Sequence, residues 1–224
     1  MLLLAITSQF LSPAAHAADT PSETVDIGVI KNSDVKVVQR RLYSKDSTFE
    51  VGVALGVLPF DGSTVAPKAQ FTGTLFLSET FGLEAHVGGG YGLTTTRYQY
   101  LAGPDYGVAV EAYRYLADLQ VDAHLSPIYA KLNFGNKILH NDWYAIAGAG
   151  ATLEQSVLPA ADIAIAPTVG LGVGTQVWLK KNMALRAELR DDLMIEFRKQ
   201  SGTAGFKQNA GVIVGLGFFS GGKK

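Results

Sequence analysis

Beyond the first 47 residues, hydrophobic and polar positions alternate along most of the chain. In residues 183–198, for example, Leu185 and Ala187 alternate with Arg186 and Glu188. A period of two is typical of β-strands whose two faces meet different surroundings. The pattern predicts eight strands, over residues 48–59, 69–77, 81–91, 126–134, 143–152, 163–179, 183–198 and 206–218.

The connections between these predicted strands alternate in length. The tight ones span residues 78–80, 135–142 and 180–182, and the longer ones span residues 58–68, 92–125, 154–162 and 199–205. Short turns at one end and longer loops at the other are typical of outer-membrane β-barrels, whose periplasmic turns are short. A sheet in hydrocarbon pairs all its backbone groups only when it closes. We therefore predict an all-β fold, an eight-stranded antiparallel up-and-down transmembrane β-barrel with both chain ends on the periplasmic side.

Composition narrows the class of protein. Only 17% of the residues are charged, against about 25% in a typical soluble domain. Mean hydropathy is +0.16, yet beyond the N-terminus no run of about 18 apolar residues predicts a transmembrane helix. The chain has no cysteine and a net charge of −1, which excludes a disulfide framework, a thiolate metal site and a strongly basic surface for nucleic acid. We predict no cofactor, no metal and no nucleic-acid partner.

Aromatic residues are placed where two membrane interfaces would lie. The set near the predicted periplasmic ends comprises Phe49, Phe81, Phe134, Trp143, Tyr144, Trp178 and Phe218. The set near the outer ends comprises Tyr91, Phe197 and Phe206. Such girdles are expected of a membrane barrel. The alternation also fits a soluble, lipocalin-like barrel with its apolar residues inside, but the girdles, the loop lengths and the 25 glycines favour the membrane.

Residues 1–17 have the features of a secretory signal peptide. An apolar core over residues 2–11 is followed by Pro13 and by Ala15-His16-Ala17, a small-residue cleavage site. No lysine or arginine precedes the core, which departs from the usual pattern. We expect residues 18–47 to form a periplasmic segment and residues 220–224 a C-terminal tail. Residues 48–219 are expected to form the barrel, in the outer membrane of a Gram-negative bacterium.

Charged residues share the predicted inward face of the strands. They are Glu50, Glu84, Lys131, Arg186, Glu188, Arg190, Asp192, Glu196 and Arg198. An eight-stranded barrel has room only for side chains, and buried charges are tolerated when they are paired and hydrogen-bonded. We therefore interpret these five acids and four bases as a structural network that fills the lumen, with a proton or ion path as the alternative.

One pair of residues suggests chemistry. On a strand, His124 and Ser126 point to the same face, and a histidine can activate a serine as a nucleophile. Outer-membrane lipid A deacylases resemble this arrangement. However, no acidic residue follows at a suitable spacing to orient the histidine. We predict no catalytic residue, with a lipid-modifying hydrolase that uses His124 and Ser126 as the alternative.

The remaining metal-binding residue types are isolated. His86 and His140 have no partner at a metal-ligand spacing. Asp191 and Asp192 are adjacent, and adjacent strand residues point to opposite faces. We expect the two aspartates at a solvated outer rim.

The connection over residues 92–125 is rich in tyrosine. It contains Tyr98, Tyr100, Tyr106, Tyr113 and Tyr115. Asp105 is placed to cap a short helix with one apolar side formed by Val108, Ala112, Tyr115, Leu116 and Leu119. This loop is interpreted either as a contact surface or as a lid over the barrel mouth.

Two motifs resemble a family of outer-membrane β-barrels found in myxobacteria, Bdellovibrio-type predators and related bacteria. The first, Q-x-R-x-[FY]-x-K with an acidic residue in the following strand, is formed here by Gln39, Arg41, Tyr43, Lys45 and Glu50. The second, S-P-[IF]-Y-G-K-[FL], corresponds to residues 126–132, with Ala130 in place of the usual glycine. The resemblance spans essentially the whole mature chain. It implies a small barrel of the OmpA or OmpW type and no single activity, although some relatives are associated with gliding-motility envelope complexes.

Together these features predict a monomeric, non-enzymatic barrel with a structural or interaction role in the cell envelope. The expected partners are outer-membrane lipid and lipopolysaccharide, the barrel-assembly machinery, and an envelope protein that contacts the loop from Tyr98 to Tyr115. The assembly machinery would recognise the C-terminal strand, which ends in Phe218 and Phe219. A small channel or a ligand-carrying barrel is a further alternative.

Overall fold

The computed structural model describes residues 43–108, 110–135, 137–157, 161–198 and 202–220. Its long strands are β1 (Phe49–Asp61), β2 (Thr64–Phe76), β3 (Phe81–Gly90), β5 (Tyr113–Phe134), β6 (Lys137–Ser156), β7 (Ile163–Lys180), β8 (Met183–Arg198) and β9 (Thr203–Phe219). A two-residue strand, β4 (Leu93–Thr94), and one helix, α1 (Thr96–Ala102), lie between β3 and β5. The predicted signal peptide and most of the predicted periplasmic segment lie outside the described residues.

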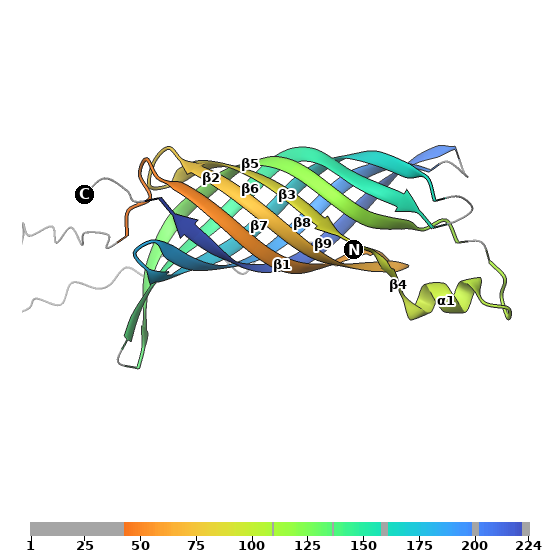
Figure 1. Ribbon diagram of the computed structural model, residues 1–224, viewed down its shortest axis with the longest axis horizontal. Coiled ribbons are helices and arrows are strands. Elements are labelled where there is room, and N and C mark those ends of the chain that lie inside the picture. The colour runs from red at the N-terminus through yellow and green to blue at the C-terminus, as the bar shows by residue number, and fades with distance from the viewer. Residues whose placement is uncertain (1–42, 109, 136, 158–160, 199–201, 221–224) are drawn as a thin grey trace, which may run out of the picture. The chain divides into compact units, whose positions relative to one another are not determined.

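The eight long strands close into a barrel (Figure 1). Every pairing is antiparallel, and the order around the sheet is β1-β9-β8-β7-β6-β5-β3-β2, with β2 pairing back to β1. The closing seam between β1 and β9 runs from Glu50 opposite Phe219 to Val57 opposite Val212. The predicted all-β up-and-down barrel of eight strands is confirmed.

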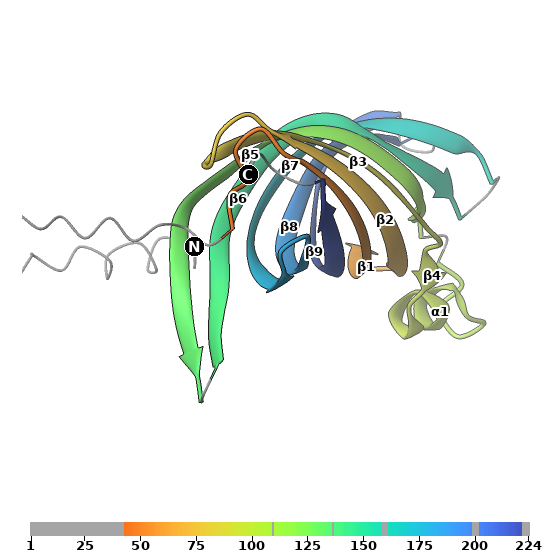
Figure 2. The same ribbon diagram turned by 60° about the vertical axis from the view of Figure 1, so that its left-hand side comes forward.

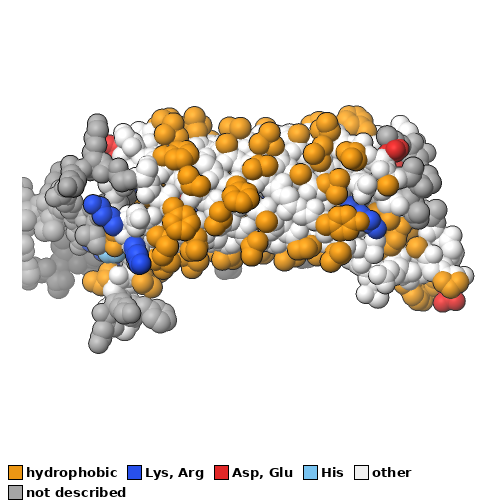
Figure 3. Space-filling view, in the orientation of Figure 1, with side chains coloured by type: hydrophobic (Ala, Val, Ile, Leu, Met, Phe, Trp, Pro, Cys, Tyr) orange, Lys and Arg blue, Asp and Glu red, His pale blue; other side chains and the backbone are white. Residues whose placement is uncertain are grey.

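The two faces of the barrel differ in chemistry. Along β1, Val51, Val53 and Leu55 are exposed on the outside, whereas Glu50 is fully buried on the inside. Figure 3 shows hydrophobic side chains spread over the visible outer face between the two ends of the barrel. This is the reverse of a lipocalin-like barrel, in which the apolar residues would face inward.

The connection between β1 and β2 is shorter than predicted. A loop over residues 58–68 is expected from the sequence, but the strands continue pairing from Val57 and Pro67 to Asp61 and Thr64. Two residues, Gly62 and Ser63, remain for the turn. The prediction failed here because the outer ends of the strands lack a clear alternation.

The connection between β3 and β5 also differs from the prediction. The helix expected after Asp105 is wrong: α1 begins earlier, and the hydroxyl of its N-cap, Thr95, accepts a hydrogen bond from the Tyr98 amide. β5 then starts at Tyr113, within the expected loop. Within the described residues, no helix is long and apolar enough to cross a membrane.

The β5–β6 hairpin extends beyond its neighbours at the end of the barrel opposite α1 (Figure 2). Pairing of β5 with β3 stops at Leu125, and pairing of β6 with β7 starts at Asn141. Between these limits the two strands pair only with each other, as far as Phe134 and Lys137. The connection expected over residues 135–142 is therefore mostly strand, and Gly135 takes the positive φ of +61° that its turn requires.

Candidate functional site

The barrel interior holds a network of buried polar side chains, and Arg186 contacts three of its carboxylates. Its guanidinium Nη2 is 2.9 Å from Glu84 Oε2 and 3.4 Å from Glu188 Oε2, while Nη1 is 3.4 Å from Glu50 Oε1. All four side chains are buried. Because β8 and β3 are four strands apart in either direction around the ring, the pair of Arg186 and Glu84 spans the lumen.

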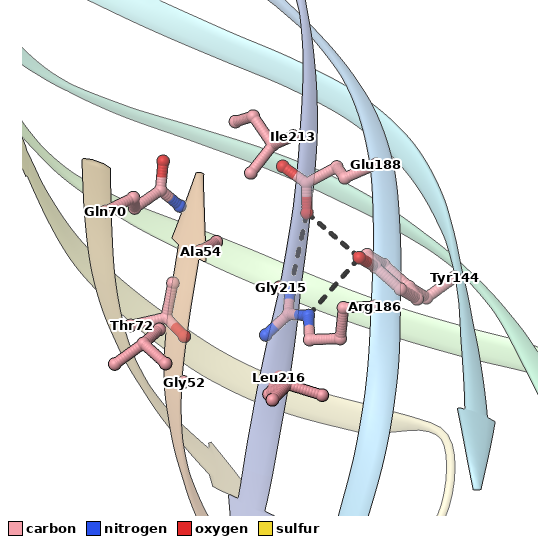
Figure 4. A pocket seen from close by; sticks show the side chains of 11 residues that line it. Gly52, Ala54, Gln70, Thr72, Tyr144, Arg186, Glu188, Ile213, Gly215 and Leu216 are labelled. Carbon is pink, nitrogen blue, oxygen red and sulfur yellow. Dashed lines mark hydrogen bonds and ion pairs between the residues drawn. The ribbon is translucent and has the colours of Figure 1, made fainter. Parts of the chain in front are cut away.

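A small cavity adjoins this cluster (Figure 4). The Tyr144 hydroxyl donates to Glu188 at 3.0 Å and accepts from Arg186 Nε at 3.3 Å. Gln70 Oε1 and Glu188 Oε1 have no hydrogen-bond partner among the described residues, and both side chains line the cavity. Its volume of about 20 Å³ has room for roughly one water molecule, and not for a file of waters.

A second arginine, Arg190, crosses the lumen nearer to the end of the barrel that carries α1. Arg190 Nη2 donates to Gln120 Oε1 at 2.8 Å and to Asp122 Oδ1 at 3.0 Å, and Arg190 Nε donates to Asp192 Oδ1 at 3.0 Å. The guanidinium passes directly over Gly170, where a Cβ atom would lie 2.3 Å from Nη2. Glycine at this position therefore leaves the space that the arginine occupies.

His86 extends this cluster toward the end that carries α1. Its Nδ1 is 3.1 Å from Asp122 Oδ2, and its Nε2 is 2.8 Å from Asp118 Oδ2. Lys68 Nζ donates to the same Asp118 oxygen at 2.7 Å, and the Tyr115 hydroxyl donates to the other. Although the sequence suggests that His86 is isolated, β5 supplies two carboxylates beside it.

At the opposite end, the segment before β1 folds into the barrel mouth. Lys45 Nζ lies 3.0 Å from Asp142 Oδ2 and donates to Ser126 Oγ at 3.2 Å. Burial lowers the pKa of the Lys45 amine, and the Asp142 carboxylate offsets this only in part. Lys45 belongs to one of the two motifs that carry the family resemblance and Ser126 to the other. Gln39 and Arg41 of the first motif lie outside the described residues.

His124 and Ser126 are hydrogen-bonded to each other inside the barrel. His124 Nε2 is 3.0 Å from Ser126 Oγ, and its Nδ1 is 3.3 Å from Glu84 Oε2. The acidic partner that the sequence does not indicate after Ser126 is thus supplied by β3, which precedes it in the chain. The three side chains have the order of a Ser-His-Glu triad, but Ser126 is only 2% exposed and faces the lumen.

Apolar clusters lie in the lumen toward both of its ends. One contains Phe76, Trp178, Ala184 and Phe219, with Tyr43 packed against it. The other contains Leu58, Ala66, Tyr113, Tyr115, Ala166 and Met194. The charged clusters around Arg186 and Arg190 lie between these two apolar clusters, whereas Lys45 and Asp142 pack against the first of them.

Two residues predicted in the aromatic girdle belong to the interior instead. Trp178 is buried, stacks on Tyr43 at a centroid distance of 4.9 Å, and donates from Nε1 to Asp142 Oδ2 at 2.8 Å. Tyr144 is buried against Arg186, as described above. Both residues occupy positions of their strands that point into the barrel. The girdle prediction considered only how close they lie to the strand ends and not which face they are on. Phe49, Trp143 and Phe218 are exposed on the outside, Phe81 is half-buried, and the side chain of Phe134 lies outside the described residues.

The structure places the predicted network residues in three different settings. Seven are buried: Glu50, Glu84, Arg186, Glu188, Arg190, Asp192 and Glu196. Glu196 lies 2.5 Å from Lys207 Nζ rather than in the central clusters. Lys131 is exposed on the protruding hairpin, and the side chain of Arg198 is outside the described residues. Buried network residues that the sequence did not indicate are Lys45, Lys68, Asp118, Gln120, Asp122, Asp142 and Gln176.

The buried charges are less balanced than the sequence predicts. Nine buried carboxylic acids face four buried lysines and arginines and two buried histidines, among the residues with described side chains. The sequence-based set contained five acids and four bases. The lumen therefore has a surplus of acidic groups.

Comparison with known proteins adds structural neighbours of low sequence identity. The chain matches no protein-family model, and no curated protein matches it significantly. Similar solved structures include the N-terminal β-barrel domain of Pseudomonas aeruginosa OprF, with 12% identity, 78% of this chain and 98% of that chain covered, and a TM-score of 0.49. Neisserial surface protein A has 8% identity, coverages of 76% and 95%, and a TM-score of 0.47. Ail of Yersinia pestis has 10% identity, coverages of 78% and 99%, and a TM-score of 0.40.

Proposed function

We propose that this protein is an outer-membrane β-barrel, not an enzyme, with a structural or interaction role in the cell envelope. One observation carries the proposal: a closed ring of strands presents apolar side chains outward and charged side chains inward. In water, so large an exposed apolar surface would drive association. In a bilayer the same surface is solvated by lipid, and the closed ring leaves no unpaired strand edge in hydrocarbon.

Fractionation with a heat-shift assay tests this placement. The full chain would be produced in a Gram-negative host, and membrane and soluble fractions would be compared on gels before and after boiling. We expect the protein in the outer-membrane fraction, with a mobility that changes on boiling because the folded barrel resists detergent. Recovery in the soluble periplasm without a heat shift would contradict the proposal.

The interaction role is assigned to the end that carries α1. Tyr100 and Tyr106 are both exposed there and contact each other at a ring-centroid distance of 4.9 Å. In contrast, Tyr113 and Tyr115 are buried in the apolar cluster at this end of the lumen. We therefore infer that the second part of the tyrosine-rich segment covers the barrel mouth and that its first part is the surface that meets an envelope partner.

The hydrolase alternative has a specific observation in its favour, the contact of Glu84, His124 and Ser126. However, the serine hydroxyl faces the lumen and is surrounded by buried Lys45 and His124. A lipid acyl chain would have to reach a serine that is buried inside the barrel, past the apolar clusters that lie toward its ends. We therefore assign this cluster a structural role.

A further inference from the structure

The part of the β5–β6 hairpin that extends beyond the ring of strands, residues 126–141, continues the apolar outer face of the barrel. Where it leaves the ring, Ile128 lies opposite Trp143 on the same face, and both side chains are exposed. Further along β5, Leu132 is exposed on this face as well. A register shift between Leu125 and Ile128 adds one residue and so keeps both side chains outward, as β-bulges do. Figures 1 and 2 show the hairpin ending to one side, beyond the outline of the barrel.

The opposite face of the hairpin is covered near the barrel by the segment before β1. The Tyr129 hydroxyl is hydrogen-bonded to His140 Nδ1, and the Tyr43 ring packs edge-on against His140 at a centroid distance of 5.2 Å. Toward the tip this face is mixed, with exposed Lys131, Asn133 and Ile138. The apolar face that continues the outer wall has no such cover among the described residues.

The backbone edges of the hairpin restrict the depth at which this apolar face can lie. From Pro127 on β5 and up to His140 on β6, the two strands pair only with each other among the described residues. An open strand edge does not occur in the hydrocarbon region, because its N–H and C=O groups would lack partners. Trp143, at the base of the hairpin, is of a residue type enriched where lipid meets water. The membrane interface therefore suits both the polar edges and the apolar face.

The charge of the hairpin favours anionic headgroups at this interface. Residues 126–141 contain two lysines, Lys131 and Lys137, and no acidic residue, whereas the lumen has a surplus of acidic groups. Basic residues next to an apolar surface add electrostatic attraction to anionic lipid.

We propose that the hairpin lies against the periplasmic leaflet of the outer membrane and binds anionic phospholipid there. Ile128 and Leu132 contact the lipid chains, and the basic residues of the hairpin lie at the level of the phosphates. The hairpin thereby anchors the barrel to one leaflet from outside the ring. This inference rests on the proposed membrane location, with the end that holds the segment before β1 facing the periplasm.

Fluorophores on single cysteines test this contact, because the chain has no cysteine of its own. Leu132→Cys and its matched control Asn133→Cys are adjacent, exposed positions on opposite faces of the hairpin. Val212→Cys, exposed on β9, reports on the outer wall of the ring. Each variant would carry an environment-sensitive dye and be refolded into vesicles that contain phosphatidylglycerol and a nitroxide-labelled lipid, with iodide on both sides of the membrane as the quencher in water. We expect the nitroxide to quench the dyes at positions 132 and 212, with emission at shorter wavelength, and iodide to quench the dye at position 133.

The three dyes separate failure of this proposal from failure of the proposed function. If the dye at position 212 reports lipid while the dye at position 132 is quenched by iodide as strongly as the dye at position 133, the hairpin contact alone is refuted. If the dye at position 212 also reports water, the proposed membrane location is refuted as well. The heat shift verifies folding of each variant, and Ile128→Cys is a second reporter on the apolar face.

Lipid composition tests the headgroup chemistry. In vesicles of phosphatidylcholine alone, we expect weaker nitroxide quenching at position 132 than in vesicles with phosphatidylglycerol. Equal quenching in the two lipids would overturn the assignment to anionic phospholipid. Shielding of this dye only after addition of periplasmic protein, or only at high density of the barrel itself, would identify a protein or a second copy as the partner and overturn the proposal.

Discussion

Arg186 and Glu84 form an ion pair across the lumen, between strands on opposite sides of the ring, at 2.9 Å. The same guanidinium contacts Glu50 on β1 and Glu188 on its own strand, so one side chain connects β8 with both β1 and β3. The network inside the barrel therefore acts as a cross-brace between the walls of the sheet.

Arg186→Ala should strongly destabilise the barrel. The substitution leaves Glu50, Glu84 and Glu188 without their shared cation, and breaking a buried ion pair costs about 3–5 kcal/mol. Urea unfolding of the protein refolded into lipid vesicles measures the change. Arg97→Ala, on the exposed surface of α1, is the matched control and should change the free energy of unfolding by less than about 0.5 kcal/mol. Equal effects of the two substitutions would show that the cross-brace does not support the fold.

The lumen should not conduct ions. The cavity beside Arg186 holds about 20 Å³, paired charged side chains fill the space around it, and apolar clusters lie toward both ends of the lumen. Purified protein in planar bilayers should show no large steady conductance, with a known porin as the positive control. A stable open channel of porin size would contradict the closed lumen.

Removal of the candidate triad should leave lipid chemistry unchanged. We expect cells that produce His124→Ala or Ser126→Ala to contain lipid A with the same acyl chains as cells that produce the unaltered protein, because Ser126 is buried in the lumen. Mass spectrometry of extracted lipid A is the measurement. An altered acyl pattern that depends on both His124 and Ser126 would restore the hydrolase hypothesis.

The seam between β1 and β9 should be essential for assembly. Deleting residues 215–224 removes five of the eight pairs that join these strands, from Ala54 opposite Gly215 to Glu50 opposite Phe219. We expect the truncated chain to be degraded in the periplasm. Among the described residues, deleting 220–224 removes the contact of Ser220 with Phe49 at the end of the seam, and this truncation should be tolerated. Comparable outer-membrane levels of both truncations on immunoblots would argue against a closed seam.

The sequence predicts best those strands whose faces differ most in charge. For β8, the predicted range of residues 183–198 equals the observed one, because charged and apolar residues alternate along most of the strand; the exceptions are Asp191 in the outward phase and the buried Met194. Most of the first half of β5 was missed although residues 118–125 alternate regularly between polar and apolar; only the start of the strand is obscured, by the register shift between Tyr115 and Ala117. Tyr115 and Asp118 both face inward across this shift, so the period of two is broken where the strand begins.

The interior site could be predicted only in part, because its contacts cross the ring. Alternation assigns Glu84 and Arg186 to the same side of the sheet, but their pairing depends on closure and on the register of the intervening strands. Glu84 beside His124 and the two carboxylates beside His86 follow from the pairing of β3 with β5. No spacing along the sequence indicates these neighbours.

The central claim is that the outer face of the barrel lies in lipid. Substituting lysine at an outward-facing position tests this claim most directly. Val214 and Val108 are both 49% exposed, but Val214 lies on β9 in the apolar belt and Val108 in the loop after α1. Val214→Lys should make the barrel in lipid bilayers less stable, by roughly 2–4 kcal/mol in the free energy of unfolding. Val108→Lys should reduce the same quantity by about 0–1 kcal/mol. Small and equal effects at the two positions would contradict a membrane-spanning barrel.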